Sequence, residues 1–206
     1  MQIIRHRINT LEQLSEIELT DGAEIDVRYH SDNLILHHDP FQHDVNNPLL
    51  LESFLSSWNC NGPLILNLKS EGIESKCIDL IKKYRVSNWF FLDMSMPFFV
   101  NYSIQSGLRS IEGFSPKNLA VRFSDFEPID YALTFKGRVD WVWIDTFQDF
   151  PLSAKSYSEL KDAGFKLCLV SPELQGFPKE EIFNMKNKIQ GFSVEAVCTK
   201  HPELWT

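Results

Sequence analysis

The stretch Gly22-Ala23-Glu24-Ile25-Asp26-Val27 decides the fold of this chain. Polar and apolar side chains alternate along it with the two-residue period of a β-strand. Glu24 and Asp26 therefore share one face of the strand, and the apolar side chains share the other.

Two motifs that contain histidine flank this strand in the sequence. Arg5-His6-Arg7 follows a short apolar start, and the apolar run Leu34–Leu36 leads into His37-His38-Asp39-Pro40. Asp32-Asn33 is typical of a turn, so the second motif should lie where a strand ends and a loop begins. Two histidines and two carboxylates are thereby expected to converge.

Outward from residues 22–27, strand patterns alternate with helix patterns. Strands are predicted at residues 1–4, 22–27 with an extension at 34–36, 64–68, 89–92, 119–123, 139–144, 165–170 and 192–198. Helices are predicted at residues 11–17, 49–58, 73–84, 97–107, 128–135, 153–163 and 179–189. Strands separated by helices favour a parallel sheet of right-handed βαβ units, and eight in succession indicate an α/β fold, the (β/α)8 TIM barrel.

The length of the chain constrains this barrel. With 206 residues the chain is near the lower size of about 200 residues for the fold, so we expect one domain over residues 1–206. Its loops should be short, apart from a polar loop over residues 42–48, and one helix can be degenerate. An open, doubly wound sheet is the alternative, but the first strand-to-helix turn, Arg5–Thr10, has no glycine and thus no dinucleotide or P-loop fingerprint.

Composition excludes several classes of function. The net charge of −8 argues against broad binding of nucleic acid or anionic membranes, although a local group of Arg and Lys can still bind a small anion. No apolar stretch approaches the roughly 20 residues of a membrane span, and the charged N-terminus does not resemble a signal peptide, so we expect a cytoplasmic protein. The four cysteines have no C-x-x-C spacing, which predicts neither a zinc site nor a disulfide framework.

The carboxyl ends of the predicted strands carry the unusual polar residues, and in a TIM barrel this end holds the active site. These residues are Arg5, His6, Arg7, Glu24, Asp26, His38, Asn67, Lys69, Arg122, Ser124, Asp145, Ser171, Glu173 and 199–202. Two carboxylates on one face of an apolar barrel repel each other unless a cation lies between them, and oxygen ligands suit Mg2+ or Ca2+. The alternative is that Arg7, Arg28 or Lys69 neutralises the pair.

The histidines and the remaining cations suggest further roles. His6 and His38 are the candidate acid and base, because the pKa of histidine lies near neutrality. Arg7, Lys69 and Arg122 either form ion pairs within the barrel or stabilise the charge of a phosphoryl group. Both interpretations remain open for these three residues.

Taken together, H-R near the N-terminus, the G-A-E-I-D-V strand and an apolar strand ending in H-D-P resemble the glycerophosphodiester phosphodiesterase family. Asn9-Thr10 is similar to the polar residues that begin the first helix of that family, and Val194–Pro202 is similar to its closing strand, V-D-G-I-x-T-D-x-P. The resemblance implies that His6 and His38 are the acid and base and that Arg7 binds phosphate. It further implies that Glu24 and Asp26 bind a metal and that Lys69 assists the phosphate.

Three departures from the family pattern stand out. The third strand of the family reads I-N-I-E-x-K, whereas this chain has Asn67 in place of the glutamate that would be the third metal ligand. An asparagine carbonyl can bind Mg2+ or Ca2+ but adds no charge, so affinity should fall unless Glu71, Asp93 or a substrate phosphate compensates. Lys200 replaces the usual aspartate, and the insertion that many members carry after H-D is absent, which predicts an open pocket.

The expected function is metal-assisted cleavage of a small glycerophosphodiester-like substrate. The resemblance implies that a substrate hydroxyl next to the phosphate attacks and that a cyclic phosphate forms before hydrolysis. The alternative is a non-catalytic or repurposed relative that binds a sugar phosphate or another small phosphorylated ligand. A lyase or isomerase of a sugar phosphate on the same barrel is a third possibility, and oligomeric state is not predicted.

Overall fold

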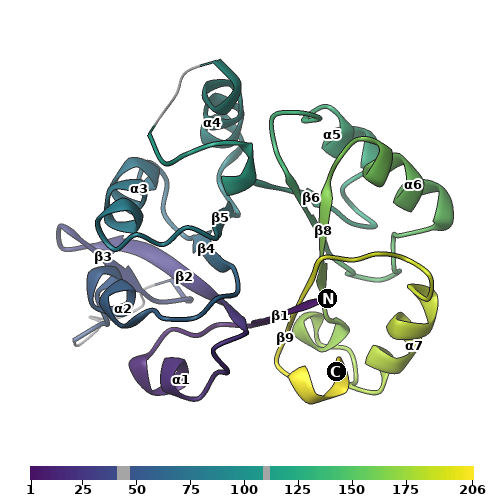
Figure 1. Cartoon of the computed structure of the whole chain (residues 1–206), viewed down its shortest axis with the longest axis horizontal. Coiled ribbons are helices and arrows are strands. Elements are labelled where there is room, and N and C mark those ends of the chain that lie inside the picture. Colours follow the sequence, from purple (N-terminus) through teal and green to yellow (C-terminus); the bar gives the residue numbers. More distant parts are fainter. Residues whose placement is uncertain (41–46, 109–111) are drawn as a thin grey trace.

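The computed structural model describes residues 1–40, 47–108 and 112–206. Residues 42–46 of the predicted polar loop therefore lie outside the described residues. Within the described ranges, strands and helices alternate along the chain, and the helices surround the strands (Figure 1).

Eight parallel strands form a nearly closed barrel, as the sequence predicts. The strands of the barrel are β1 (Gln2–Arg5), β2 (Gly22–His30), β4 (Leu64–Leu68), β5 (Trp89–Leu92), β6 (Ala120–Phe123), β7 (Trp141–Ile144), β8 (Lys166–Val170) and β9 (Ala196–Thr199). A further strand, β3 (Asn33–Leu36), is antiparallel. Their order in the sheet is β5-β4-β2-β1-β9-β8-β7-β6, and β3 pairs with β2 outside this series. The (β/α)8 fold is thus confirmed, and the open doubly wound sheet is wrong.

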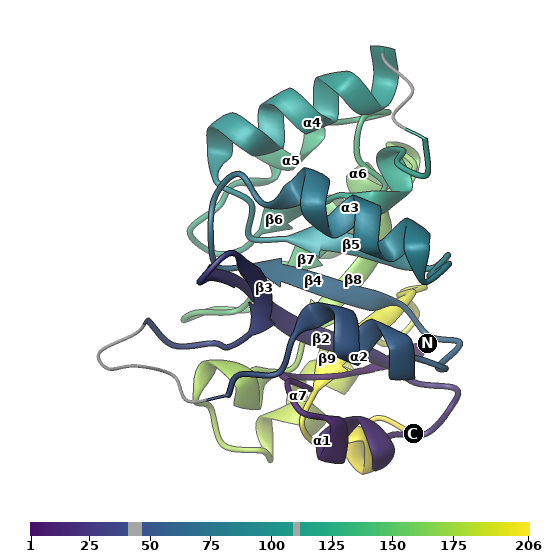
Figure 2. The ribbon, with the colours of Figure 1, turned by 90° about the vertical axis from the view of Figure 1, so that its left-hand side faces the viewer.

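Apart from α4, which is longer by one residue at each end, the helices are shorter than the sequence patterns suggest. They are α1 (Leu11–Ser15), α2 (Leu51–Ser57), α3 (Glu74–Lys83), α4 (Met96–Leu108), α5 (Ile129–Leu133), α6 (Ala154–Asp162) and α7 (Glu181–Lys188), with short 3-10 turns η1 (Pro116–Asn118), η2 (Pro172–Gln175) and η3 (Pro202–Leu204). In the side view, α2 and α3 lie in front of β2 and β4 (Figure 2). Across the described residues, no helix is both long enough and apolar enough to cross a membrane.

Two predicted segments take a different form. The extension at residues 34–36 is a separate strand, β3, which pairs antiparallel with β2 (Val27 opposite Leu36). The last strand was predicted to begin at Phe192 but begins at Ala196. The ring of Phe192 instead stacks on Tyr157 of α6, with ring centroids 4.3 Å apart, so this residue serves helix packing rather than the sheet.

The close approach of two chain segments explains why β2 begins with glycine. A Cβ atom at Gly22 would lie 2.3 Å from the carbonyl oxygen of Pro63, which no side chain tolerates. The amide of Ala23 donates to that same carbonyl at 3.0 Å. The start of β2 is therefore fixed against the segment that leads into β4, and this fixes the register that the site needs.

The alternation of side chains separates two cores. One lies between the barrel and the helices and includes Ala23, Ile25 and Val27. The other fills the barrel interior and consists of Ile4, Ile65, Phe90, Leu92, Ala120, Trp141, Trp143, Cys168, Val170, Ala196 and Cys198. Glu24 and Asp26 project into the interior, as predicted, because they alternate with the outward residues of β2.

The barrel closes between β5 and β6 through few contacts, and α4 and α5 flank this seam (Figure 1). Its backbone pairing is a single isolated bridge between Phe91 and Leu119. At one end of the seam the buried Asn118 amide donates to the carbonyl of Trp89 at 2.9 Å. Side chains thus supply much of the closure that backbone ladders supply elsewhere in the barrel.

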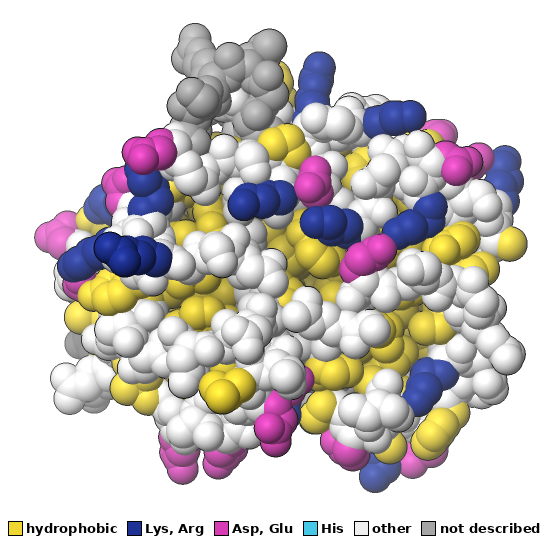
Figure 3. All heavy atoms as spheres, in the orientation of Figure 1, with side chains coloured by type: hydrophobic (Ala, Val, Ile, Leu, Met, Phe, Trp, Pro, Cys, Tyr) yellow, Lys and Arg dark blue, Asp and Glu magenta, His cyan; other side chains and the backbone are white. Residues whose placement is uncertain are grey.

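The surface drawn in Figure 3 mixes both signs of charge. Lys and Arg side chains are interspersed there with Asp and Glu, and apolar side chains show between them. That face therefore presents no continuous basic surface of the kind that binds nucleic acid.

We predict that Asn118→Ala lowers the free energy of unfolding by about 2 kcal/mol, because it leaves the buried Trp89 carbonyl without its donor. Urea denaturation followed by far-UV circular dichroism measures this loss. Asn88→Ala, which removes an exposed amide with a longer contact of 3.4 Å to Asn61, is the matched control and should cost little. Equal losses in the two variants would show that Asn118 does not hold the seam.

Candidate functional site

Three of the predicted metal ligands meet inside the barrel. Asp26 on β2 lies opposite Asn67 on β4 in the parallel ladder. Glu24, Asp26 and Asn67 are all buried, with relative exposures of 1%, 0% and 8%. The amide nitrogen of Asn67 donates to Oε1 of Glu24 at 2.8 Å. The structure therefore brings the three side chains together, and the asparagine contacts the glutamate directly.

The environment of Glu24 strongly disfavours its charged form. Burial, and next the negative charge of Asp26, raise the pKa of Glu24 from 4.5 to about 7. The hydrogen bonds from the Asn67 amide and from the backbone N–H of Arg7 act in the opposite direction. A pair of carboxylates at this depth holds its full charge only when a cation joins it.

Asp26 is held by an asparagine that was predicted only to start a helix. The Asn9 amide donates to Oδ2 of Asp26 at 2.7 Å, and Oδ1 of Asn9 accepts from the Asp26 N–H at 2.9 Å. The N-cap of α1 is Thr10, which forms a capping box with Gln13. Asn9 is thus a positioning residue whose role depends on a contact across 17 residues of sequence.

Two oxygens in this group lack hydrogen-bond partners in the described part of the chain. They are Oδ1 of Asp26 and Oδ1 of Asn67, and both are buried. Lys69 approaches Asp26, with 3.6 Å between Nζ and Oδ1. Buried oxygens without donors are costly unless a ligand completes them. Together with Glu24 they make an oxygen-only donor set that fits Mg2+ or Ca2+.

This set has only two charged members. Among the described residues, no three His, Cys, Asp or Glu side chains gather in a way that would hold a metal ion. Asp93, which could have replaced the missing carboxylate, instead pairs with Lys69 at 3.5 Å and with Arg122 at 2.6 Å. A cation here would therefore be bound by two carboxylates and one amide oxygen, as the sequence suggests.

His6 and His38 lie on either side of Arg7. Nε2 of His6 is 3.8 Å from Oε2 of Glu24. The Arg7 guanidinium donates to Nε2 of His38 at 2.5 Å, and Nδ1 of His38 donates to Asp39 at 2.7 Å. The structure thus places His6 beside Glu24 and connects His38 to this group through Arg7.

Arg7 adopts a backbone conformation that side chains rarely take. Its φ of 55° is in the left-handed region, and its N–H donates to Oε2 of Glu24 at 2.8 Å. Strain of this kind persists where surrounding contacts fix it, which is common at functional sites.

Burial, followed by the charge of Arg7, lowers the pKa of His6 from 6.5 to about 3, so this imidazole is neutral at pH 7.

Arg28 holds backbone segments of the site together. Its guanidinium donates to the backbone carbonyls of His37 at 3.1 Å, His38 at 2.7 Å and Lys69 at 3.2 Å. These bonds join the segment after β3 to the end of β4. The sequence suggested Arg28 as a partner of the carboxylates, and the structure shows that it also holds the backbones that carry His38 and Lys69.

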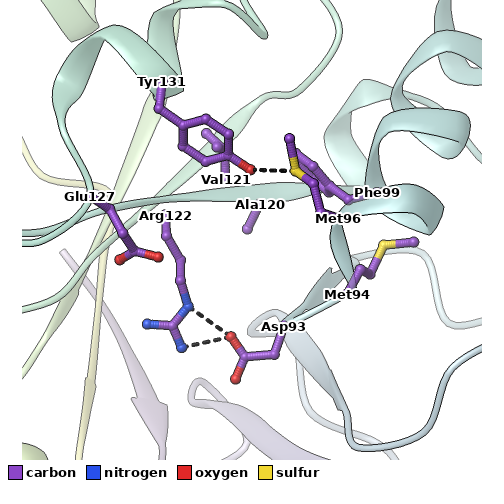
Figure 4. A pocket seen from close by; sticks show the side chains of 9 residues that line it. All are labelled: Asp93, Met94, Met96, Phe99, Ala120, Val121, Arg122, Glu127 and Tyr131. Atoms are coloured by element: carbon purple, nitrogen blue, oxygen red, sulfur yellow. Dashed lines mark hydrogen bonds and ion pairs between the residues drawn. The ribbon is translucent and has the colours of Figure 1, made fainter.

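Arg122 takes part in a chain of ion pairs at the mouth of the barrel. It bonds to Asp93, as Figure 4 shows, and it also reaches Asp145 at 2.8 Å. Asp145 in turn accepts from Gln175 at 2.7 Å. This geometry favours the ion-pairing interpretation for Arg122. The pair with Asp93 also links β6 to the residue that follows β5.

Next to this chain of ion pairs is a cavity of about 240 Å3. It is lined by Asp93, Met94, Met96, Phe99, Ala120, Val121, Arg122, Glu127 and Tyr131. The Tyr131 hydroxyl faces the sulfur of Met96, and Arg122 turns toward Asp93 (Figure 4). The cavity therefore lies at the β5–β6 seam and has neither histidine of the site in its wall.

Comparison with solved structures identifies the class of fold. A glycerophosphodiester phosphodiesterase from Agrobacterium tumefaciens superimposes with a TM-score of 0.67 at 13% identity, over 100% of this chain and 99% of that chain. A glycerophosphoryl diester phosphodiesterase from Parabacteroides distasonis superimposes with a TM-score of 0.65 at 13% identity, over 98% of this chain and 84% of that chain. The chain thus has the barrel fold of these phosphodiesterases, as the resemblance in sequence implies. No family model matches the chain, and no curated protein sequence matches it significantly.

We predict that Glu24→Gln changes the pH dependence of stability in metal-free protein. Because the pKa of Glu24 is raised on folding, the stabilising contribution of this group to the free energy of unfolding is fully present below pH 4.5. It is lost as the pH rises through about 7. Glutamine stays neutral, so the variant should gain roughly 2 kcal/mol relative to wild type between pH 5 and pH 8. Urea denaturation with chelator at both pH values measures this difference.

The new amide can be accommodated, because Asn67 can turn its side chain and offer the Oδ1 atom that now lacks a donor. Glu180→Gln, a change at an exposed residue, is the control and should show no such dependence. A Glu24→Gln variant that keeps the pH profile of wild type would contradict the raised pKa.

Proposed function

We propose that this chain is a metal-dependent phosphodiesterase of the glycerophosphodiester type that acts on a small substrate. One observation carries the proposal: at the carboxyl end of a TIM barrel, His6 lies 3.8 Å from the buried Glu24 of a carboxylate pair, and the neighbouring Arg7 bonds to His38. The fold shared with solved phosphodiesterases supports it. The site residues therefore have the chemistry that such a reaction requires.

The two histidines would transfer the protons. Because Nδ1 of His38 donates to Asp39, the lone pair of the imidazole is at Nε2, where it accepts from Arg7. Once Arg7 turns to the bound phosphate, this Nε2 would accept the proton of the attacking hydroxyl. His6 would give a proton to the leaving oxygen, and because its imidazole is neutral at pH 7 in the free protein it would first take up that proton from solvent when the substrate binds. Its low pKa makes its protonated form a strong acid, and a bound phosphate would offset the neighbouring positive charge.

A divalent ion, Mg2+ or Ca2+, held by Glu24, Asp26 and Asn67, would supply Lewis-acid stabilisation of charge on the phosphate when bound. Arg7 would add a positive charge beside both histidines. Lys69 lies between Asp26 and Asp93, so its first role is to balance these carboxylates. We therefore assign phosphate binding to Arg7 before Lys69 or Arg122.

A non-catalytic relative that binds a small phosphorylated ligand is the second candidate. It is favoured by one contact, because the Asn67 amide nitrogen occupies an oxygen of Glu24 that a metal would need. Turnover separates the two candidates, since the binding protein would bind phosphate esters without cleaving them.

We predict that His6→Ala and His38→Ala each lower kcat on a panel of glycerophosphodiesters by about 10²- to 10⁴-fold. Release of the alcohol, followed by a coupled assay or by phosphorus NMR, measures this. His30→Ala, at the turn between β2 and β3, is the control. If both active-site variants keep wild-type turnover, the assignment of acid and base is wrong.

We also predict that Asn67→Glu binds Mg2+, Ca2+ or Mn2+ at least about tenfold more tightly than wild type, because a third carboxylate adds charge to the set. Isothermal calorimetry of the apoprotein measures the affinity, and Glu24→Ala should abolish the heat of binding. Unchanged affinity in Asn67→Glu would mean that residue 67 does not face the ion. No binding by wild type, even with inorganic phosphate present, would favour the non-catalytic candidate.

A further inference from the structure

The ends of β1 and β9 lie side by side at the mouth of the barrel. Arg5 is paired with Thr199 in the parallel ladder, and the N–H of His6 donates to the Thr199 carbonyl at 3.2 Å. Ile4 and Cys198, one pair earlier, both point into the barrel interior. His6 and Lys200 are the next residues in this alternation, directly after the ends of β1 and β9, so the two residues lie at the mouth of the barrel.

The cations at the mouth differ in how they are paired. Lys69 lies between Asp26 and Asp93, and Arg122 is bonded to Asp93 and Asp145. Lys200 forms no ion pair with any carboxylate in residues 1–40, 47–108 or 112–206. The side chain of Arg7 contacts a histidine rather than a carboxylate. The positive charges of Arg7 and Lys200 are therefore available to an anionic ligand.

Buried donors close to this point also lack partners. Nε of Arg7 and Nδ1 of His6 are buried and have no hydrogen-bond partner in the described part of the chain. Buried polar atoms without partners are groups that a bound ligand can satisfy.

Glu173, after β8, holds the backbone of Lys200 in place. Its Oε1 accepts from the Thr199 hydroxyl at 2.6 Å and from the Lys200 N–H at 3.0 Å. Its other oxygen accepts from Ser171, whose hydroxyl also accepts from the Trp205 indole at 2.9 Å. The Lys200 side chain is exposed, but the bonds from Glu173 to Thr199 and to the Lys200 N–H hold the backbone that carries it.

We propose that Lys200 and Arg7 form an anion site beside His6 that binds the phosphate group of the substrate. This inference rests on the proposed function and deepens it, because it names a phosphate-binding residue on the closing strand. The ligand chemistry is a phosphate ester or free phosphate, bound by direct contact with protein cations. Lys200 would contribute charge and Arg7 would contribute both charge and directed hydrogen bonds.

The test measures binding of inorganic phosphate to the intact, EDTA-treated protein by isothermal calorimetry at low salt. We expect Lys200→Gln to bind phosphate about tenfold more weakly than wild type, which corresponds to about 1.4 kcal/mol. Lys200→Arg should restore most of the affinity, because it retains the charge. Lys179→Gln removes an exposed lysine elsewhere and is the control for a general effect of net charge.

Three outcomes would overturn the proposal. They are wild-type protein that binds no phosphate, a Lys200→Gln variant with wild-type affinity, and equal weakening in Lys200→Gln and Lys179→Gln. Dimethyl phosphate, titrated in parallel, distinguishes a site for diesters from a site for phosphate or monoesters. Phosphate binding that depends on Lys200 in a protein that cleaves no diester would refute the phosphodiesterase and leave the anion site standing.

Discussion

The structure of the site depends on one electrostatic constraint, which is that two carboxylates share the interior face of a single buried strand. Glu24 and Asp26 cannot both be charged at that depth without help. Asn9, Asn67 and the backbone of Arg7 provide hydrogen bonds, and Lys69 provides a partial counter-charge. The protein compensates the pair only in part, and the remaining deficit is what a divalent ion would fill.

The same belt of polar side chains connects the candidate site to the closure of the barrel. From Asp26 the contacts run through Lys69, Asp93 and Arg122 to Asp145, with charges that alternate in sign. Because Asp93 follows β5 and Arg122 is on β6, this series bridges the seam that the backbone leaves almost unpaired. A charge removed at the mouth would therefore disturb the barrel as well as the site.

Local patterns in the sequence predicted the barrel and the convergence of Glu24, Asp26 and Asn67, because alternation and strand order determine which face each residue occupies. The positioning roles of Asn9 and Arg28 were not predictable in this way. Arg28 bonds to the carbonyl of Lys69, which is 41 residues away in the sequence. This contact depends on how β2 packs against the segment that follows β4. The left-handed turn at Arg7 likewise leaves no signal in a residue type that rarely adopts it.

The seam between β5 and β6 has a consequence for the unfolding behaviour of the protein. A closed barrel has no edge strands, and an open one exposes two rows of unpaired backbone groups that can pair with other chains. In this protein a few contacts across the seam keep the barrel closed. They are the Asn118 hydrogen bond, the backbone bridge between Phe91 and Leu119, and the Asp93–Arg122 ion pair. The seam is therefore the place where partial opening would first create an aggregation-prone edge, and selection for solubility would act on these few side chains.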